Sequence, residues 1–188
     1  MHNLTRRSIL LGGLATLAPA SAAGTEVQIE NWLSLSKGQH ATHKFHGQYW
    51  TLWHRTDAQT QAAEDVNVAE LADQTVRHAN LGDAQNGTDS GLPATNQNIG
   101  FGPGNQFILM SLVCPRRGCV VVQGAGDFDG FFCPCGSAHY DTAGRVRRGP
   151  FARNLSTLSV SLDGSTLIAK DSRATLPGKA IERSLGWD

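Results

Sequence analysis

The sequence of 188 residues lacks several features that would place it in a common functional class. Its 16 basic and 16 acidic residues cancel, so no net charge favours binding to nucleic acid. It has no repeats, and 40% hydrophobic residues is too many for a disordered tail. We expect one domain with its own core, or a main domain that carries a small subdomain.

The N-terminus has the pattern of an export signal. Thr5-Arg6-Arg7-Ser8 precedes an apolar run from Ile9 to Ala18, and small residues follow. The paired arginines favour the twin-arginine route, with a general secretory signal as the alternative. We interpret residues 1–26 as this signal or as a short membrane anchor, and we expect the mature domain on the periplasmic side or in the periplasm.

The middle of the chain predicts a mainly β fold. Gln39 to Phe45 and Tyr49 to Arg55 have strand composition around a turn at His46-Gly47-Gln48. Phe107 to Val113 is also strand-like, and it leads into the first cysteine. Ser156 to Ala169 predicts a hairpin with a two-residue type I′ turn at Asp163-Gly164.

Two other segments complete this layout. Asn67 to Asn80 has apolar residues at helical spacing and predicts one helix. Asp83 to Asn105 is rich in Gly, Asn, Pro and Thr and predicts a long surface loop. We assign residues 27–170 to one domain and 171–188 to a C-terminal tail, and we expect the tryptophans at positions 32, 50 and 53 to pack in the core.

The four cysteines fall in two pairs, Cys114 with Cys119 and Cys133 with Cys135. Two short loops that approach each other can clamp a metal or cluster between them, or can be cross-linked by disulfides. A four-cysteine zinc site is a further alternative, although the single residue between Cys133 and Cys135 is unusual for zinc. An oxidising compartment favours disulfides.

A family resemblance narrows these alternatives. CPRRGC, GDFDGFFCPC and HYDTAGRVRRGP resemble, with matching spacing, the cluster-binding subdomain of the Rieske iron-sulfur subunit of quinol:cytochrome c reductases. That family has C-T-H-x-G-C in its first loop and C-P-C-H-G-S-H-Y-D in its second. The resemblance implies an antiparallel β base domain and a cluster-binding subdomain at about residues 112–153.

The resemblance also implies site residues. Cys114 and Cys133 are in the positions of the two thiolate ligands of a 2Fe-2S cluster, and Cys119 and Cys135 are in the positions of the disulfide that joins the loops. Tyr140 of the family's HYD triplet is retained. The family serine that hydrogen-bonds the cluster is replaced by Ala138, and Gly149-Pro150 is followed by Phe151 and Ala152 instead of the family's Gly-Pro-x-Pro.

The two histidine ligands of the family are missing. Arg116 and Gly136 occupy their positions. Glycine has no side chain, and arginine stays protonated and offers no lone pair to a metal. His139 is the only histidine after Asn80, and the family does not use that position as a ligand. Recruitment of His139, or an all-cysteine cluster that sacrifices the disulfide, are the remaining ways to hold a cluster.

Without a cluster, the two thiolate positions predict a second disulfide. Cysteines that share one iron in the family must lie close together, so Cys114 and Cys133 can be joined in an oxidising compartment. The surrounding arginines then predict a basic tip: Arg116, Arg117, Arg145, Arg147, Arg148 and Arg153. Such a tip suits an acidic partner surface or an anionic head group, or it is a solvated face with no partner.

Two hypotheses of function follow. By resemblance, the chain passes electrons from quinol to a c-type cytochrome at the membrane, with cytochrome b and the c-type cytochrome as partner subunits. By its ligand chemistry, it is a cluster-free Rieske fold that serves a structural, assembly or regulatory role. Only about seven residues separate Pro19 from the predicted base domain, a reach of roughly 25 Å, and so short a hinge weakens the electron-shuttle hypothesis.

Overall fold

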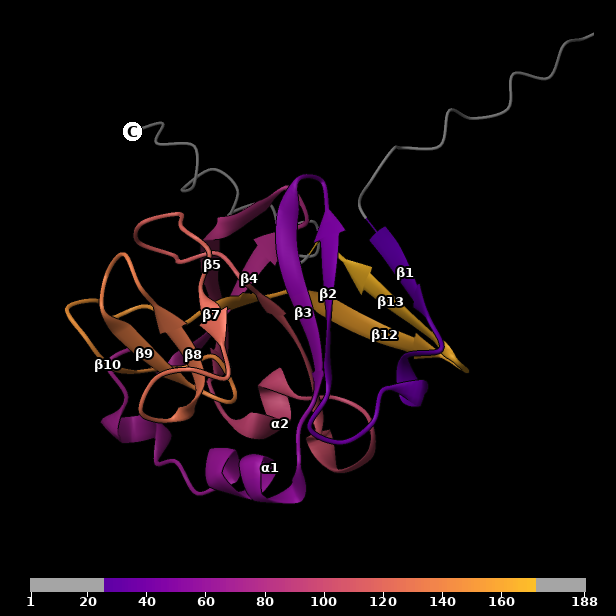
Figure 1. Ribbon diagram of the computed structural model, residues 1–188, viewed down its shortest axis with the longest axis horizontal. Helices are drawn as coiled ribbons and strands as arrows, with labels where there is room; N and C mark the ends of the chain where they lie inside the picture. Colours follow the sequence, from indigo (N-terminus) through magenta and orange to yellow (C-terminus); the bar gives the residue numbers. More distant parts are fainter. Residues whose placement is uncertain (1–25, 172–188) are drawn as a thin grey trace, which may run out of the picture.

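The structure, a computed structural model, describes residues 26–171 and is mostly antiparallel β-sheet (Figure 1). The predicted mainly β class is confirmed. The predicted export signal or anchor and the C-terminal tail lie outside the described residues, apart from Glu26 and Asp171. No helix between residues 26 and 171 has the length and apolar character needed to cross a membrane.

A six-stranded sheet forms the centre of the molecule. Its strands, in spatial order, are β2 (His40–Phe45), β3 (Gln48–His54), β6 (Phe107–Ser111), β11 (Ser156–Thr157), β4 (Thr75–Asn80) and β5 (Asp83–Pro93). Strands β4 and β11 run parallel, and the other neighbours are antiparallel. The predicted β2–β3 hairpin is present, but Gln48 belongs to β3, so its loop is two residues long, and positive φ angles at both His46 and Gly47 suit a type I′ turn.

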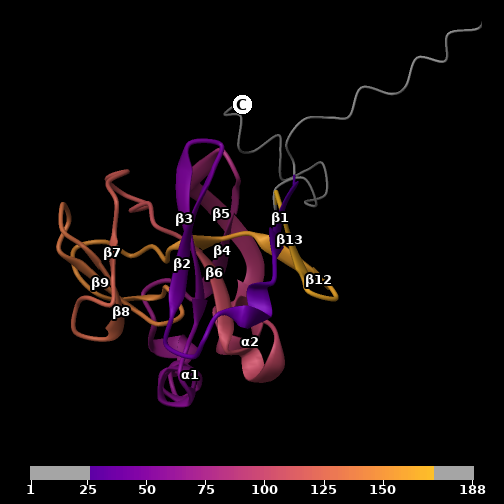
Figure 2. The ribbon, with the colours of Figure 1, turned by 45° about the vertical axis from the view of Figure 1, so that its right-hand side comes forward.

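Two smaller sheets lie on opposite sides of the central one (Figures 1 and 2). The three-stranded sheet consists of β1 (Glu26–Glu30), β13 (Thr166–Lys170) and β12 (Ser159–Asp163). The four-stranded sheet consists of β10 (Val146–Arg148), β9 (Ala138–Asp141), β8 (Asp129–Cys133) and β7 (Val122–Gln123). The latter sheet and its loops fall within the predicted cluster-binding subdomain.

The predicted β12–β13 hairpin is present, but its turn is one residue later than expected. Asp163 pairs with Thr166, so the two loop residues are Gly164 and Ser165. A type I′ turn needs positive φ at both loop residues, and only Gly164 has it. The prediction of type I′ at Asp163-Gly164 is therefore wrong.

The predicted helix over residues 67–80 is also wrong. That segment contains a 3-10 turn, η2 (Val68–Glu70), and then strand β4. Val76 and Ala79, three residues apart on this strand, are both buried because they point to opposite faces of the central sheet and pack into different hydrophobic clusters. A strand that is buried on both faces thus reproduces the apolar spacing that predicted a helix.

The longer helix lies upstream instead, at α1 (Asp57–Glu64). It begins with a capping box, in which the Thr56 hydroxyl accepts from Gln59 N at 3.2 Å and the Gln59 side chain accepts from Thr56 N at 2.9 Å. The Thr-x-x-Gln spacing was the signal in the sequence for this helix.

The predicted loop over residues 83–105 is likewise mostly structured. It contains β5, the short helix α2 (Asn96–Ile99) and the 3-10 turn η3 (Pro103–Asn105). Elsewhere in the chain, another 3-10 turn, η1 (Trp32–Ser34), follows β1. The polar residues of β5 form a strand because the backbone of β4 supplies its hydrogen bonds. Gly87 is necessary there, since a side chain at that position would collide with Ser156 of β11.

Two hydrophobic clusters hold the three sheets together. One fills the space between the central and three-stranded sheets and includes Trp32 and Trp50. The other joins the central sheet to the four-stranded sheet and includes Trp53, Phe131 and Tyr140. The three tryptophans are 3% or less exposed, which confirms their predicted place in the core.

A buried carboxylate fixes the loop after η2. Asp73 accepts hydrogen bonds from Arg77 Nε at 2.8 Å, from Arg77 Nη2 at 2.7 Å and from the backbone of Asn154 at 2.8 Å. Burial by itself raises the pKa of Asp73, but the hydrogen bonds and the Arg77 charge outweigh it, so the pKa lies below its ordinary value.

This lowered pKa predicts a pH dependence of stability. The folded protein binds the Asp73 proton more weakly than the unfolded chain does. The ionised carboxylate therefore adds to the free energy of unfolding above the unfolded-state pKa, and this contribution is lost as the pH falls through the folded-state pKa. We expect Asp73→Asn to lower the free energy of unfolding by about 1–3 kcal/mol at pH 7 and by less at about pH 3. Denaturant titrations at both pH values measure this, and an equal loss at both would contradict it.

Candidate functional site at the cysteine loops

Two loops, one between β6 and β7 and one between β8 and β9, bring all four cysteines together. The first loop, residues 114–119, follows β6 and is closed by backbone hydrogen bonds from Cys114 to Cys119 and from Gly118 to Cys114, both 2.8 Å. The second, residues 133–136, joins β8 to β9 and is closed from Gly136 to Cys133 at 3.2 Å. All four sulfur atoms lie within 4.8 Å of one another.

The structure joins Cys119 to Cys135 in a disulfide, the pairing that the resemblance implies. Cys114 and Cys133 are buried thiols with their sulfurs 2.8 Å apart. The Cys133 sulfur is also 3.7 Å from Cys119 Sγ and 3.6 Å from Cys135 Sγ. The predicted second bridge is not formed in this structure, although its two sulfurs are adjacent.

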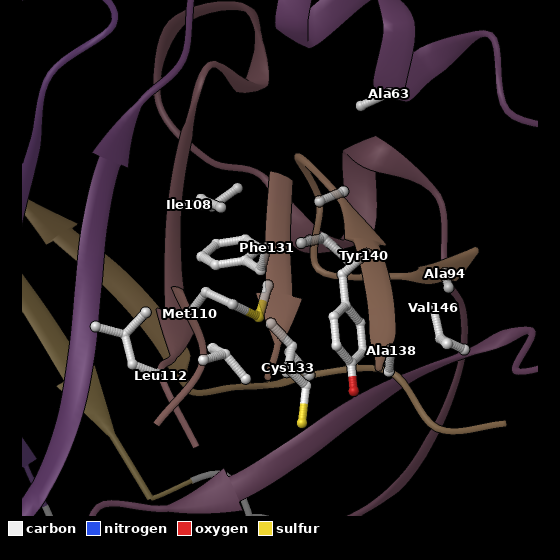
Figure 3. Packing of buried hydrophobic residues seen from close by; sticks show 14 of the residues in the cluster. Ala63, Ala94, Ile108, Met110, Leu112, Phe131, Cys133, Ala138, Tyr140 and Val146 are labelled. Carbon is white, nitrogen blue, oxygen red and sulfur yellow. The ribbon is translucent and has the colours of Figure 1, made fainter. Parts of the chain in front are cut away.

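The surroundings of Cys133 favour its uncharged thiol. Burial, and then the neighbouring Cys114, raise the pKa of Cys133 to about 12. Tyr140 lies beside them within the hydrophobic cluster, and its hydroxyl and the Cys133 sulfur point the same way (Figure 3). Burial and the two thiols raise the pKa of Tyr140 as well.

The position of the missing second-loop histidine is filled by a phenyl ring. A Cβ atom at Gly136 would collide with Cε2 of Phe151 and lie 2.6 Å from Cζ of that ring. The backbone of Gly136 does not need glycine for conformational reasons, because its φ is not in the left-handed region. The phenyl ring thus occupies the place where a ligand side chain would begin.

No other nitrogen-bearing side chain near the described cysteine loops replaces the missing histidine ligands. Arg116 is exposed on the first loop. His139 is occupied on β9, where its Nδ1 lies 3.2 Å from Asp127 N and its Nε2 lies 3.2 Å from Arg148 Nη2. The residues of this site therefore do not fit a Rieske 2Fe-2S cluster: two thiols suit one iron, and no imidazole is placed for the other.

Half of the predicted basic tip is neutralised by carboxylates, which corrects the interpretation of the six arginines. Arg145 is completely buried, and its Nε donates to Asp141 at 2.8 Å. Arg147 lies 3.5 Å from the same carboxylate, and exposed Arg148 is paired with Asp127. Among residues 26–171, Arg116, Arg117 and Arg153 have no ion-pair partner.

The roles of Phe151 and Arg145 were missed by sequence reasoning. For Phe151 a signal existed, since the next residue, Ala152, replaces the second proline of the family's Gly-Pro-x-Pro segment. For Arg145 the charge pattern alone gave none, because three arginines occur within four residues. Ala138, in place of the family serine, is buried and offers the sulfurs no hydroxyl.

Comparison with known proteins agrees with this geometry. The Rieske [2Fe-2S] domain family matches residues 67–159. The ubiquinol-cytochrome c reductase iron-sulfur subunit of Cereibacter sphaeroides is 38% identical over 65% of this chain and 62% of its own length. The mitochondrial Rieske subunit of the Saccharomyces cerevisiae cytochrome b-c1 complex is 31% identical over 73% of this chain and 54% of its own.

The length of the match differs between relatives. The ubiquinol-cytochrome c reductase iron-sulfur subunit of Bradyrhizobium diazoefficiens is 29% identical over 80% of both chains. The chain spans about half to two thirds of the first two relatives. With the cysteine loops and the disulfide in place, residues 67–159 are a Rieske domain, and the chain is homologous to the Rieske iron-sulfur subunits of ubiquinol-cytochrome c reductase.

Proposed function

We propose that this chain is a Rieske-fold subunit of a cytochrome bc-type complex that holds no standard Rieske cluster and acts through protein contacts. The observation that carries this proposal is the Phe151 ring at the position where a second-loop histidine would begin. A Rieske centre needs two imidazoles on one iron, which is also what sets its high potential. This site supplies none.

The partners in this proposal come from the relatives. Their printed names describe iron-sulfur subunits of ubiquinol-cytochrome c reductase and of the cytochrome b-c1 complex. We extend to this chain the association with cytochrome b and a c-type cytochrome, at the periplasmic face of a membrane where quinol is oxidised. The paired Arg6-Arg7 in the N-terminal segment supports export, and a neutral chain supports no role with nucleic acid.

The competing function is electron transfer by this chain itself. The observation in its favour is the group of four sulfurs within 4.8 Å of one another. A cluster on four thiolates would require Cys119 and Cys135 to give up their disulfide, and would take the low potential of an all-cysteine site instead of the high Rieske potential. A quinol donates electrons poorly to such a centre, so the geometry favours the structural role.

The proposal predicts a protein without iron. The full chain, exported in its native host, should contain neither iron nor acid-labile sulfide, and should give no low-temperature electron paramagnetic resonance signal after reduction with dithionite. The homologous subunit from Cereibacter sphaeroides, prepared in the same way, is the control, and it should contain iron and give a signal.

Two outcomes would contradict the proposal. A Rieske-type signal with stoichiometric iron would mean that the loop rearranges to recruit nitrogen ligands. A different iron-sulfur signal that disappears in a Cys119→Ser variant would assign the cluster to four cysteines. Non-reducing mass spectrometry adds a third measurement: we expect Cys114 joined to Cys133 and Cys119 to Cys135, whereas free thiols at Cys114 and Cys133 with bound iron would favour electron transfer.

A further inference from the structure

A groove of about 710 Å³ lies beside the cysteine loops. Its lining includes Pro115 and Arg116 of the first loop, Gln85 of β5, and Phe151 and Arg153 of the segment after β10. The first loop packs directly on β5, since a Cβ atom at Gly118 would lie 2.8 Å from the Gln85 side-chain oxygen. Three segments far apart in sequence thus form one concavity.

The charges of this groove have one sign. Arg116 and Arg153 both line it, and no aspartate or glutamate does. Neither arginine forms an ion pair with any residue from 26 to 171, although Arg145, Arg147 and Arg148 nearby are all paired. Guanidinium groups bind carboxylates and phosphates through paired hydrogen bonds. The groove is therefore suited to an anionic group.

The volume and the apolar lining of the groove favour an acidic peptide over a small inorganic anion. A volume of about 710 Å³ is in the range of sites for extended organic ligands and exceeds the size of one inorganic anion. The half-buried Phe151 also lines the groove and adds apolar surface to it. A peptide with acidic side chains offers both carboxylates and apolar atoms, whereas a lone phosphate offers only charge.

We propose that this groove docks an acidic segment of a partner protein, with Arg116 and Arg153 binding its carboxylates and Phe151 contacting its apolar atoms. The site lies where the family has a ligand histidine on the first loop, so Arg116 replaces a metal ligand with a residue for protein recognition. This inference depends on the groove residues alone, and its test contains no iron measurement, so it can fail independently of the proposed function.

The test is a nuclear magnetic resonance titration of the full chain, labelled with ¹⁵N-arginine, with a hexaglutamate peptide. The variants Arg116→Gln, Arg153→Gln and Arg148→Gln assign the three Nε–Hε signals and serve as binding variants. We expect saturable shifts at Arg116 and Arg153, none at Arg148, and an affinity about fivefold weaker for each groove variant. Arg148→Gln is the matched control and should bind with unchanged affinity, since Arg148 is exposed and already paired with Asp127.

Several results would overturn the proposal. No saturable shift at Arg116 and Arg153 would do so, as would equal shifts at Arg148, which would indicate general charge attraction. A hexaglutamine peptide that binds equally well would exclude recognition of carboxylates. Stronger binding of inorganic phosphate, or of phosphatidylglycerol vesicles, would assign the groove to a phosphate group instead of an acidic protein segment.

Discussion

Replacement of Arg145 by methionine should lower the free energy of unfolding by about 3–5 kcal/mol. The Arg145 guanidinium is buried and donates to Asp141 at 2.8 Å, to the Ala63 carbonyl of α1 at 2.7 Å and to the Ala94 carbonyl at 3.1 Å. Arg145→Met leaves the buried Asp141 charge without its main partner and two carbonyls without a donor. Denaturant unfolding followed by tryptophan fluorescence measures the loss.

The matched control for Arg145→Met is Arg148→Met. Arg148 also pairs with an aspartate, but on the surface, so its removal should change the free energy of unfolding by about 1 kcal/mol or less. Equal effects of the two substitutions would show that burial of Arg145 contributes nothing to stability. A larger loss for Arg145 would show that its buried hydrogen bonds help to hold the β9–β10 turn against α1.

Replacement of Gly136 by histidine should not restore a metal ligand while Phe151 is present. The new side chain would collide with the Phe151 ring, and forcing extra atoms into a packed site costs about 1–3 kcal/mol. We expect Arg116→His with Gly136→His to be destabilised and free of iron. Adding Phe151→Ala removes the ring and should allow the triple variant to bind iron after reconstitution.

A double-mutant cycle separates the collision from other effects of these substitutions. If the ring causes the cost, Gly136→His should be less destabilising in the Phe151→Ala background than in the parent, by about 1–2 kcal/mol. Additive effects, or a Gly136→His variant as stable as the parent, would show that the ring moves aside freely. In that case the absence of a ligand would depend on residue identity alone, and the double histidine variant should bind iron.

The structure corrects the sequence where local pattern and tertiary pairing disagree. Val76 and Ala79 have helical spacing, yet they belong to a bulged strand because β5 and β11 supply its hydrogen bonds. The polar composition of residues 83–93 predicts a loop, but a strand at the edge of a sheet needs only backbone partners. β5 follows β4 directly in the chain, but β11 comes from a distant segment, so a window of the local sequence contains only one of the two partner strands of β4.

The sequence by itself determined the chemistry of the cysteine loops. Their spacing identified the family, and the identities of Arg116 and Gly136 removed both imidazoles, because a ligand that is absent from the chain cannot be restored by folding. Only the tertiary structure decided which side chain fills the space of the absent histidine ligand at Gly136. The Phe151 ring over Gly136, the burial of Arg145 and the meeting of Arg116 and Arg153 in one groove depend on the tertiary structure, which local pattern does not encode.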